Sequence, residues 1–395
     1  MRIVYCTPSL YLAGGVERVL TTKVNYLADV GGHDVTVILT DGKGKEPFYK
    51  LSPKVKVVQL DIGFERMWNR PLWQRAWIYI RGMRRYKQAL RKTLMELRAD
   101  IVVSTMRREI NFICDIPDGS HKIGELHVTR KHYRNFEANE NNSFKQWLSN
   151  RWSCQLVEKV QGLDALVVLT PHEVTQWPEL ENVRCIPNPL PFHIASDEEM
   201  AARQRHNDAS GAVICVGRYS YQKGIDLLLN TWAEVSKQHP SWRLDIYGSG
   251  DRKPYQQQAV DLGLLPDATT FESRTLRLLP ASDDIRSEYL SHDIYALSSR
   301  FEGFGMVIIE AEACGLPVVA FDCPTGPKEL VDDTRTGLLV PDGDVAAMAS
   351  ALNKLIKEKA LREQMSIAAR KAVMRFDVQN VMLQWQQLFA EITSF

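Results

Sequence analysis

The sequence predicts an α/β protein built on parallel β-sheets, and three observations carry this prediction. Short apolar runs that fit buried strands alternate with amphipathic helical patterns along most of the 395 residues. Two glycine-rich turns, at 13–15 and 303–305, each follow a strand-like run and open a helical pattern. The chain is also long enough for two or three domains with a substantial core.

Composition narrows the class of protein. The apolar content of 45% and charged content of 25% are typical of a soluble globular protein, and a net charge of +1 gives no overall attraction to nucleic acid. The seven cysteines are scattered without CxxC spacing, so neither a zinc site nor a disulfide framework is indicated. No apolar run approaches the ~18–20 residues of a membrane span, and charged residues follow the apolar start where a signal peptide would be cleaved. We expect a cytoplasmic protein, at most attached to a membrane surface.

The first half of the chain opens with strand, helix and strand. The run 2–7 is a strand, the turn AGGVER leads into a helix ending near Asp29, and 34–40 is the next strand. A GxGxxG dinucleotide fingerprint is absent, which argues against NAD binding. Further strands are predicted at 55–60, 100–104, 122–126, 163–170 and 183–186.

The second half repeats this pattern after a polar stretch, 193–210, which we interpret as a linker between domains. Strands are predicted at 212–218, 243–247, 294–297 and 316–321, and helices at 306–313 and within 345–375, with one more helix starting near 222. A last amphipathic helix follows Phe376-Asp377.

The turn at 301–305 is the strongest functional signal. A glycine turn that opens a helix presents unpaired N–H groups and the positive end of the helix dipole, which suits a phosphate. Glu302 and Glu310 frame this turn, so hydroxyl-rich groups can bind on both sides of a diphosphate. A nucleotide-sugar has that chemistry. The alternative is an ordinary strand–turn–helix with two surface glutamates.

Two cations follow the strand 212–218. Arg218 and Lys223 both project from its carboxyl end, so their charges can converge on one phosphate group. Exposed surface positions are the alternative for both. His127 also follows a strand end, where ligands of open α/β sheets bind, although a lone histidine is more often structural.

The segment Glu302-GFGMVII-Glu310 resembles the donor-site signature of retaining glycosyltransferases of the GT-B fold, in particular glycosyltransferase family 4, and CGLPVVAFDCPTGPKELV and TGLLVPDGD resemble its continuation. The resemblance implies two Rossmann-like, doubly wound domains facing a cleft, with a C-terminal helix that crosses back to the first domain. It implies an acceptor-binding domain over 1–190, with 376–395 packed against it, and a nucleotide-sugar-binding domain over 191–375.

The resemblance also implies roles for individual residues. Those implied at the reaction centre are His127, Arg218, Lys223 and Glu302. Those implied to bind the donor are Gly15, Gly248, Gly303, Phe304, Gly305, Met306, Val307 and Glu310. Those implied on the acceptor side are Gly14, Glu17 and Arg18.

The implied activity is that of a retaining hexosyltransferase, which moves a hexose or N-acetylhexosamine from a nucleotide-sugar to a saccharide acceptor. We expect a UDP-sugar donor, a polyprenyl-diphosphate-linked saccharide acceptor and a role in surface polysaccharide biosynthesis. The loop 271–284, where the family contacts the base, leaves uracil and guanine both open. We expect no metal and no other cofactor, because Asp342-Gly343-Asp344 fits a turn better than a metal clamp.

Two alternative functions remain. One is a nucleotide-sugar epimerase or hydrolase of the same fold, and the other is a two-domain sugar-binding protein without catalytic activity. An export signal, which a sugar-binding protein would want, is absent, and a cationic pair facing an anion site, which it would not need, is present. Both observations favour the enzyme.

A basic, aromatic stretch occupies 64–98. It holds ten Lys/Arg residues against two Glu, interleaved with five Trp/Tyr residues, and Arg107, Arg108, Arg130, Lys131 and Arg134 extend the bias. An ordinary solvated basic helix is one interpretation. The sharper one is a surface that rests on anionic lipid at the inner face of the cytoplasmic membrane, since arginines supply charge and aromatic rings lie at headgroup depth. Nucleic acid is not expected, because no reader motif is present.

Overall fold

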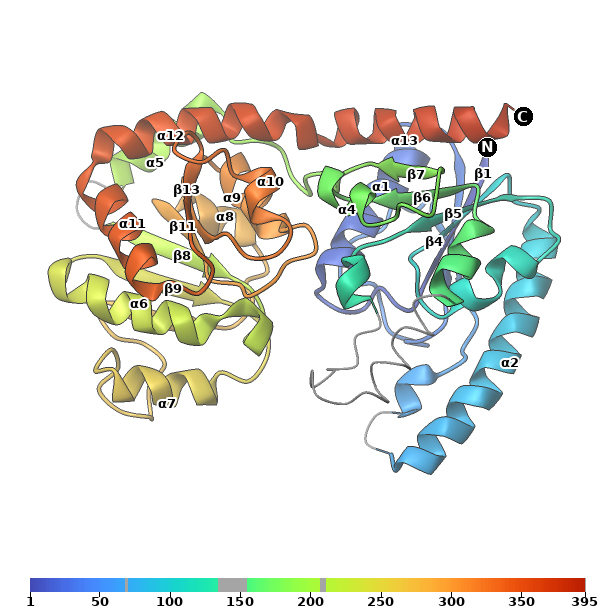
Figure 1. Cartoon of the computed structure of the whole chain (residues 1–395), viewed down its shortest axis with the longest axis horizontal. Coiled ribbons are helices and arrows are strands. Elements are labelled where there is room, and N and C mark those ends of the chain that lie inside the picture. The colour runs from blue at the N-terminus through green and yellow to red at the C-terminus, as the bar shows by residue number, and fades with distance from the viewer. Residues whose placement is uncertain (68–69, 134–154, 207–210, 395) are drawn as a thin grey trace. The chain divides into compact units, whose positions relative to one another are not determined.

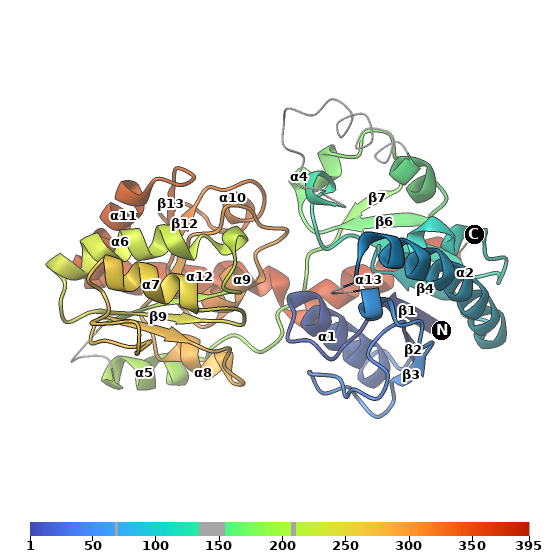
Figure 2. The same cartoon turned by 90° about the horizontal axis from the view of Figure 1, so that it is seen from below.

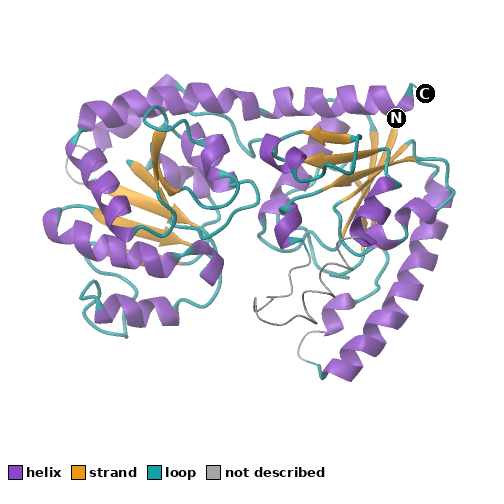
Figure 3. Ribbon diagram, in the orientation of Figure 1, coloured by secondary structure: helices purple, strands orange, loops and turns teal. Residues whose placement is uncertain are grey.

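The structure is a computed structural model that describes residues 1–67, 70–133, 155–206 and 211–394. The chain divides into two compact units, Met1–Pro189 with Val378–Phe395, and Leu190–Asp377. Each unit is built around its own β-sheet, flanked by helices on both faces (Figures 1 and 3). Below they are called the first and the second unit.

The first unit contains, among its described residues, a seven-stranded sheet in the order β3-β2-β1-β4-β5-β6-β7. Its strands are β1 (Arg2–Thr7), β2 (Asp34–Leu39), β3 (Lys56–Gln59), β4 (Ile101–Ser104), β5 (His121–Glu125), β6 (Ala165–Val168) and β7 (Val183–Cys185). All of these strands pair in parallel. The strand order reverses between β1 and β4, which makes that pair the switch point of the sheet.

Successive side chains of each strand point to opposite faces of this sheet, so each face packs against its own hydrophobic core. Ile3 and Tyr5 face a cluster shared with α1 (Gly15–Asp29) and α13 (Val378–Thr393), whereas Val4 and Cys6 face a cluster shared with α2 (Leu72–Leu97). The C-terminal helix therefore belongs to the core of the first unit. It contributes the buried side chains of Trp385 and Phe389.

The second unit contains, within the part of the chain that is described, a six-stranded sheet in the order β10-β9-β8-β11-β12-β13. The strands are β8 (Ala212–Val216), β9 (Arg243–Tyr247), β10 (Leu276–Leu279), β11 (Ile294–Leu297), β12 (Val318–Phe321) and β13 (Gly337–Val340), all paired in parallel. On one face lie α6 (Ile225–Gln238), α7 (Lys253–Asp261) and α11 (Val345–Lys357). On the other lie α8 (Ile285–Leu290), α9 (Met306–Ala313) and α12 (Lys359–Ala372), as Figure 2 shows.

Two further short helices of the chain are α4 (Pro171–Thr175) and α10 (Pro327–Leu330). The predicted α/β class with two parallel sheets is confirmed.

The predicted linker over 193–210 is wrong for much of its length, because α5 (Asp197–His206) forms there. Its acidic first turn is anchored to other helices of the second unit. Glu199 accepts two hydrogen bonds from the Arg286 guanidinium, at 2.8 and 3.0 Å, and Asp197 lies 2.9 Å from Arg370. Polar composition alone did not distinguish a loop from a helix held by such ion pairs. The remaining residues of the stretch, 207–210, lie outside the described residues.

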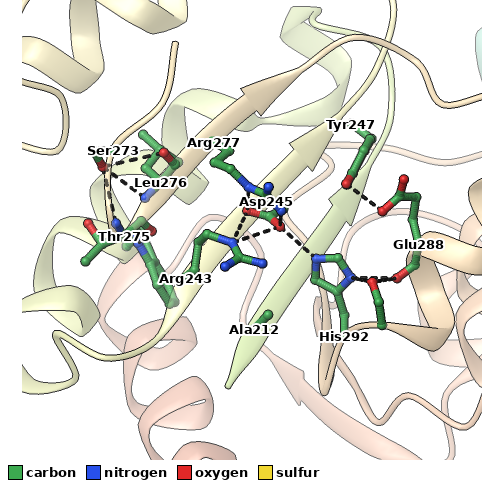
Figure 4. A network of polar contacts seen from close by, with 12 residues as sticks. Ala212, Arg243, Asp245, Tyr247, Ser273, Thr275, Leu276, Arg277, Glu288 and His292 are labelled. Carbon is green, nitrogen blue, oxygen red and sulfur yellow. Dashed lines mark hydrogen bonds and ion pairs between the residues drawn. The ribbon is translucent and has the colours of Figure 1, made fainter. Parts of the chain in front are cut away.

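A buried carboxylate ties three parts of the second unit together (Figure 4). Asp245, in the middle of β9, accepts from Arg243 Nε and Arg277 Nε at 2.8 Å each, and lies 3.0 Å from His292 Nε2. Burial would raise the pKa of Asp245, but these three groups hold it well below its usual range. The network joins β9 to β10 and to the residue pair that precedes β11.

A second buried carboxyl group has no such set of partners. Glu312, on α9, is fully buried, and burial raises its pKa from 4.5 to about 8, while Thr336 and Arg375 oppose the rise only in part. The folded protein therefore keeps this group protonated at neutral pH.

The ionisation of Glu312 predicts a pH dependence of stability. Because its folded pKa lies above the unfolded value, its contribution is fully present below about pH 4.5 and is lost as the pH rises through 8. Glu312→Gln, a neutral side chain of the same shape, should raise the free energy of unfolding at pH 8 by on the order of 3 kcal/mol and change it little at pH 4.5. Urea denaturation at both pH values measures this. The exposed Glu363→Gln on the same face should leave both values unchanged; an equal effect of Glu312→Gln at both pH values would contradict the prediction.

Candidate functional site

The predicted donor residues of the second unit gather at the switch point of its sheet. The strand order reverses between β8 and β11, which lie side by side, so the segments after these strands lead to opposite faces of the sheet. The place between the starts of these two segments is called the crevice below. Arg218 and Lys223 follow β8, and Glu302 lies on the turn after β11. Gly248 follows β9, the other neighbour of β8.

Two of these turns approach so closely that one position requires glycine. A Cβ atom on Gly248 would lie 1.8 Å from the Gly217 carbonyl oxygen. The neighbouring backbone is fixed by Tyr219, whose N–H donates to the Ser249 carbonyl at 2.8 Å and whose hydroxyl donates to the Ile246 carbonyl at 2.7 Å. The turns after β8 and β9 are therefore packed together and joined by these hydrogen bonds.

An ion pair bridges the switch point. Lys223 Nζ lies 2.7 Å from Glu302 Oε1, and the two side chains are only 15% and 7% exposed. The residues are 79 positions apart in the sequence. Gly224 keeps Lys223 in place, because its φ of +58° is left-handed and a Cβ there would lie 1.9 Å from the Ser298 carbonyl oxygen. The Ser298 hydroxyl in turn donates to the Lys223 carbonyl at 3.0 Å.

The helix α9 begins at this crevice. Its N-cap, Gly305, has a left-handed φ of +94° and supplies no side-chain cap, and the Ile308 N–H donates to the Gly305 carbonyl at 2.9 Å. Among the described residues, the N–H groups of Met306 and Val307 at the helix start are therefore the ones that can meet an incoming acceptor. Phe304 is buried against Phe376, with the two rings edge to face at 5.7 Å, and this contact holds the turn. Arg218 is exposed and forms no ion pair with any described residue. The arrangement combines a helix N-terminus and two cations, which is chemistry suited to a diphosphate.

The second predicted glutamate lies deeper along α9. Glu310 is 4% exposed, and its Oε2 accepts a hydrogen bond from the buried Tyr289 hydroxyl at 3.2 Å. Tyr289 itself packs edge to face on Tyr295, at 6.0 Å between ring centroids. Tyr289 of α8 thus holds Glu310 in place.

Sequence reasoning missed the loop that supports Glu302. The Thr325 hydroxyl donates to the Glu302 carbonyl at 2.7 Å, and the Glu302 N–H donates to the Pro324 carbonyl at 3.4 Å. Gly326 has a φ of +96°, and a Cβ atom at this position would lie only 2.7 Å from the Phe304 carbonyl oxygen, so a side chain would not fit there. In the sequence, Pro324-Thr325-Gly326 predicted only a turn and gave no sign that this turn contacts Glu302.

The remaining predicted residues lie in the first unit. Gly14 is the N-cap of α1 and Gly15 its first residue; the Glu17 carboxylate folds over Gly14, while the Arg18 guanidinium lies 5.4 Å from the Tyr49 ring centroid. His127 follows β5 and is nearly buried. The structure therefore groups the donor residues of the second unit with one another and holds the acceptor-side residues on the other unit.

Asp342, Gly343 and Asp344 form a turn. The Asp344 carboxylate caps α11 by accepting from the Ala347 N–H at 2.9 Å, and Gly343 has a left-handed φ of +74°. Among the residues that the structure describes, no three His, Cys, Asp or Glu side chains gather closely enough to hold a metal ion. The same residues include no helix with the length and apolar character needed to cross a membrane.

Comparison with known proteins identifies the second unit. Residues 196–372 match the family model of glycosyl transferases group 1. This match spans most of the second unit. An uncharacterized glycosyltransferase of Haemophilus influenzae is 27% identical over 384 residues, which are 95% of this chain and 96% of that protein. These findings support membership of the chain in the group 1 glycosyltransferases.

Two further relatives carry a described activity. The amylovoran biosynthesis glycosyltransferase AmsD of Erwinia amylovora is 31% identical over 232 residues, or 57% of this chain and 62% of AmsD. An α-1,4-N-acetyl-D-galactosaminyltransferase of Campylobacter jejuni, named for an undecaprenol-diphosphate-linked saccharide, is 25% identical over 389 residues, or 96% of each chain.

Solved structures extend the likeness over both units of this chain. TarM of Staphylococcus aureus, in a complex that contains UDP, superposes with a TM-score of 0.76 over 98% of this chain and 99% of TarM, at 16% identity. HepE of Anabaena, bound to UDP and glucose, superposes with a TM-score of 0.71 over 99% of this chain and all of HepE, at 20% identity. The predicted GT-B fold class is confirmed.

Proposed function

We propose that this protein is a retaining glycosyltransferase of family 4, which moves a hexose or N-acetylhexosamine from a UDP-sugar to a lipid-linked saccharide in surface polysaccharide biosynthesis. The observation that carries the proposal is the crevice of the second unit. It combines the Lys223–Glu302 pair, the exposed Arg218 and the uncapped start of α9 at the switch point of a parallel sheet.

Each group in the crevice has a task in such a transfer. As the bond from sugar to diphosphate breaks, negative charge grows on the leaving phosphate, and Arg218, Lys223 and the amides of 303–307 stabilise it. Glu302 accepts hydrogen bonds from hydroxyls of the sugar, and Glu310 from the ribose. The acceptor hydroxyl then attacks on the face that the diphosphate leaves, and the departing phosphate takes its proton, so the anomeric configuration is retained.

The named substrates of similar proteins support the choice of donor and acceptor. TarM and HepE were crystallised with UDP, and the Campylobacter jejuni relative is named for an undecaprenol-linked acceptor. AmsD is named for amylovoran biosynthesis. We therefore favour UDP-N-acetylhexosamines and UDP-hexoses as donors and polyprenyl-diphosphate saccharides as acceptors, with Gly14, Glu17 and Arg18 on the acceptor side and His127 beside the donor sugar.

Two cations at the phosphate site give the first prediction for this function. Arg218→Ala and Lys223→Ala should each lower transfer by about 10²–10³-fold, because each removes one charge that stabilises the leaving diphosphate. UDP release from a panel of UDP-sugars, with and without a lipid-linked acceptor, measures this. UDP formed equally well without any acceptor would favour the epimerase or hydrolase alternative, and donor binding without turnover would favour a sugar-binding protein.

A matched control separates catalysis from stability. Lys354→Ala removes an exposed lysine on α11 and should leave turnover unchanged. Since Lys223→Ala leaves the Glu302 carboxylate without its partner, thermal unfolding of every variant is compared with the wild type. Near-normal turnover in a folded Arg218→Ala variant would remove the central claim.

The same cations predict that transfer needs no metal ion. Arg218, Lys223 and the start of α9 supply positive charge where other enzymes use Mg²⁺ or Mn²⁺. Turnover should therefore persist, within about twofold, in excess EDTA. A loss of turnover that added Mg²⁺ or Mn²⁺ restores would show this part of the proposal to be wrong.

A lipid-linked acceptor implies contact with a membrane, and α2 offers a surface for it. On the helix face opposite the core, Trp73, Trp77 and Ile80 are 71%, 60% and 55% exposed. Arginines 81, 84 and 91 share this face and form no ion pair with any described residue. On the opposite side, Gly82 lets the helix approach Phe64 so closely that a Cβ would lie 2.8 Å from that ring.

The composition of this face favours lipid over a soluble polyanion. Between Leu72 and Leu97 the helix carries seven basic residues and one acidic residue, and the Arg81 guanidinium lies 5.2 Å from the Trp77 ring centroid. Exposed tryptophans among arginines suit the headgroup layer of an anionic membrane. Arg130 adds little, because it is paired with Glu179 at 2.8 Å, and Arg134 lies outside the described residues. We propose peripheral attachment at the inner face of the cytoplasmic membrane.

Liposome flotation tests the membrane surface. The protein should float with vesicles containing phosphatidylglycerol, less with phosphatidylcholine alone, and release at high salt. Replacing Arg81, Arg84, Arg85 and Arg91 by Glu should abolish flotation, and Trp73→Ala with Trp77→Ala should weaken it. Glu at four exposed lysines of the second unit, Lys253, Lys354, Lys357 and Lys371, is the matched control and should leave it intact. Wild-type protein that stays unbound at low salt would overturn the membrane part alone.

A further inference from the structure

The first unit buries an ion pair that the predicted site does not include. Lys23, on α1, is fully buried, and its Nζ lies 2.6 Å from Oε2 of Glu125, the last residue of β5. The two residues are 102 positions apart. Apolar side chains of similar volume could hold α1 on the sheet at least as well, since desolvating two charges costs about as much as their attraction returns.

The indole of the C-terminal helix completes the enclosure of the lysine. Lys23 Nζ lies 3.6 Å from the Trp385 ring centroid and 5.4 Å from that of Tyr5. Burial lowers the pKa of Lys23 to about 8, while the charge of Glu125 opposes this. The ammonium group is thus fixed between a carboxylate and an aromatic face, with little freedom to move.

The other oxygen of this carboxylate faces His127. Glu125 Oε1 lies 3.5 Å from His127 Nε2, and the histidine side chain is 5% exposed. Nε2 is buried and makes no hydrogen bond within the described ranges 1–67, 70–133, 155–206 and 211–394. Burial lowers the pKa of His127 to about 4, the Glu125 charge opposes this, and the charges of Lys23 and Arg107 add to it. The imidazole is neutral at pH 7.

A carboxylate can only accept a hydrogen bond, so the ring nitrogen that faces it must carry the proton. In a neutral imidazole the other nitrogen, Nδ1, is then left as an acceptor. We propose that Lys23 and Glu125 are positioning residues that fix His127 as the Nε2–H tautomer, with Nδ1 ready to accept a hydrogen bond from a substrate hydroxyl. This inference rests on the proposed function for the identity of that substrate, a sugar hydroxyl.

The alternative is that the pair only ties α1 to β5. In that case replacing it by uncharged side chains would change stability but not the state of the histidine. The two possibilities therefore differ in a quantity that can be observed at His127 directly.

Long-range ¹H–¹⁵N NMR of histidine-labelled protein reports the tautomer, and His127→Gln assigns the signal. The wild type should show Nε2–H. In Glu125→Gln the amide can donate to Nε2, so the Nδ1–H form should become populated. If that variant fails to fold because Lys23 is left unpaired, Lys23→Met with Glu125→Gln removes both charges and serves instead. Glu109→Gln changes a buried carboxyl group that accepts hydrogen bonds from Ser104 and Tyr86, on the side of the sheet that packs against α2, and is the matched control.

Kinetics supply an independent readout. His127→Ala and the Lys23→Met, Glu125→Gln double variant should each lower kcat about tenfold, with less effect on the KM for the UDP-sugar. Because all three residues act through one hydrogen bond, adding His127→Ala to the double variant should cost less than about twofold more.

A folded Glu125→Gln variant in which His127 keeps the wild-type tautomer would overturn the inference, as would losses of kcat that multiply in the triple variant. The NMR result needs no turnover. If the protein transfers no sugar, the proposed function is refuted, but the tautomer of His127 still decides the role of Lys23 and Glu125.

Discussion

Parallel strand pairing is the constraint on which the rest of this molecule depends. It brings the carboxyl ends of all described strands to one edge of each sheet, so the turns that follow the strands gather there, which is where open α/β sheets bind their ligands. At the switch point of the second unit, β8 and β11 send their following segments apart, and the crevice between them holds Lys223 and Glu302. The backbone must then approach itself closely. Gly248 and Gly224 meet this need, because a Cβ on either would lie less than 2 Å from a carbonyl oxygen.

The Lys223–Glu302 pair gives this crevice a definite state before any ligand binds. Each charge is largely removed from water, so each would be costly to leave without a partner. Under the proposed function, a diphosphate takes the place of Glu302 beside Lys223, and the carboxylate turns to the sugar hydroxyls. The incoming ligand thus exchanges one ion pair for another, which limits the desolvation cost of binding. If Lys223 and Glu302 were separate and hydrated, their desolvation would add to the free-energy cost of binding the ligand.

Local signals made much of the fold and part of the site predictable. The pattern for a buried strand, a glycine turn and a helix occupies only about fifteen consecutive residues, so the two parallel sheets and the start of α9 could be inferred from the sequence. Arg218, Lys223 and Glu302 follow strand ends and Glu310 lies within α9, and the resemblance to glycosyltransferase family 4 is what implied a role for each of them.

Contacts between distant segments were beyond such reasoning. The pairing of Lys223 with Glu302 spans 79 residues and that of Lys23 with Glu125 spans 102, and no periodicity records which side chains meet. The helix α5 was missed because its stability comes from ion pairs with α8 and α12 rather than from an apolar face. Lys23 in particular resembled any other helical lysine, because burial is a property of the assembled core.

The buried charges of this protein differ in what they leave unsatisfied, and that difference separates structure from function. Asp245 receives three donors and has little capacity left, so it serves the sheet. Glu312 avoids the cost of a buried charge by keeping its proton. Glu125 uses one oxygen for Lys23 and turns the other toward an imidazole whose nearer nitrogen is buried and makes no hydrogen bond to any residue that the structure describes. Only this third carboxylate can still act on a neighbouring group, which is why Lys23 and Glu125 point to His127.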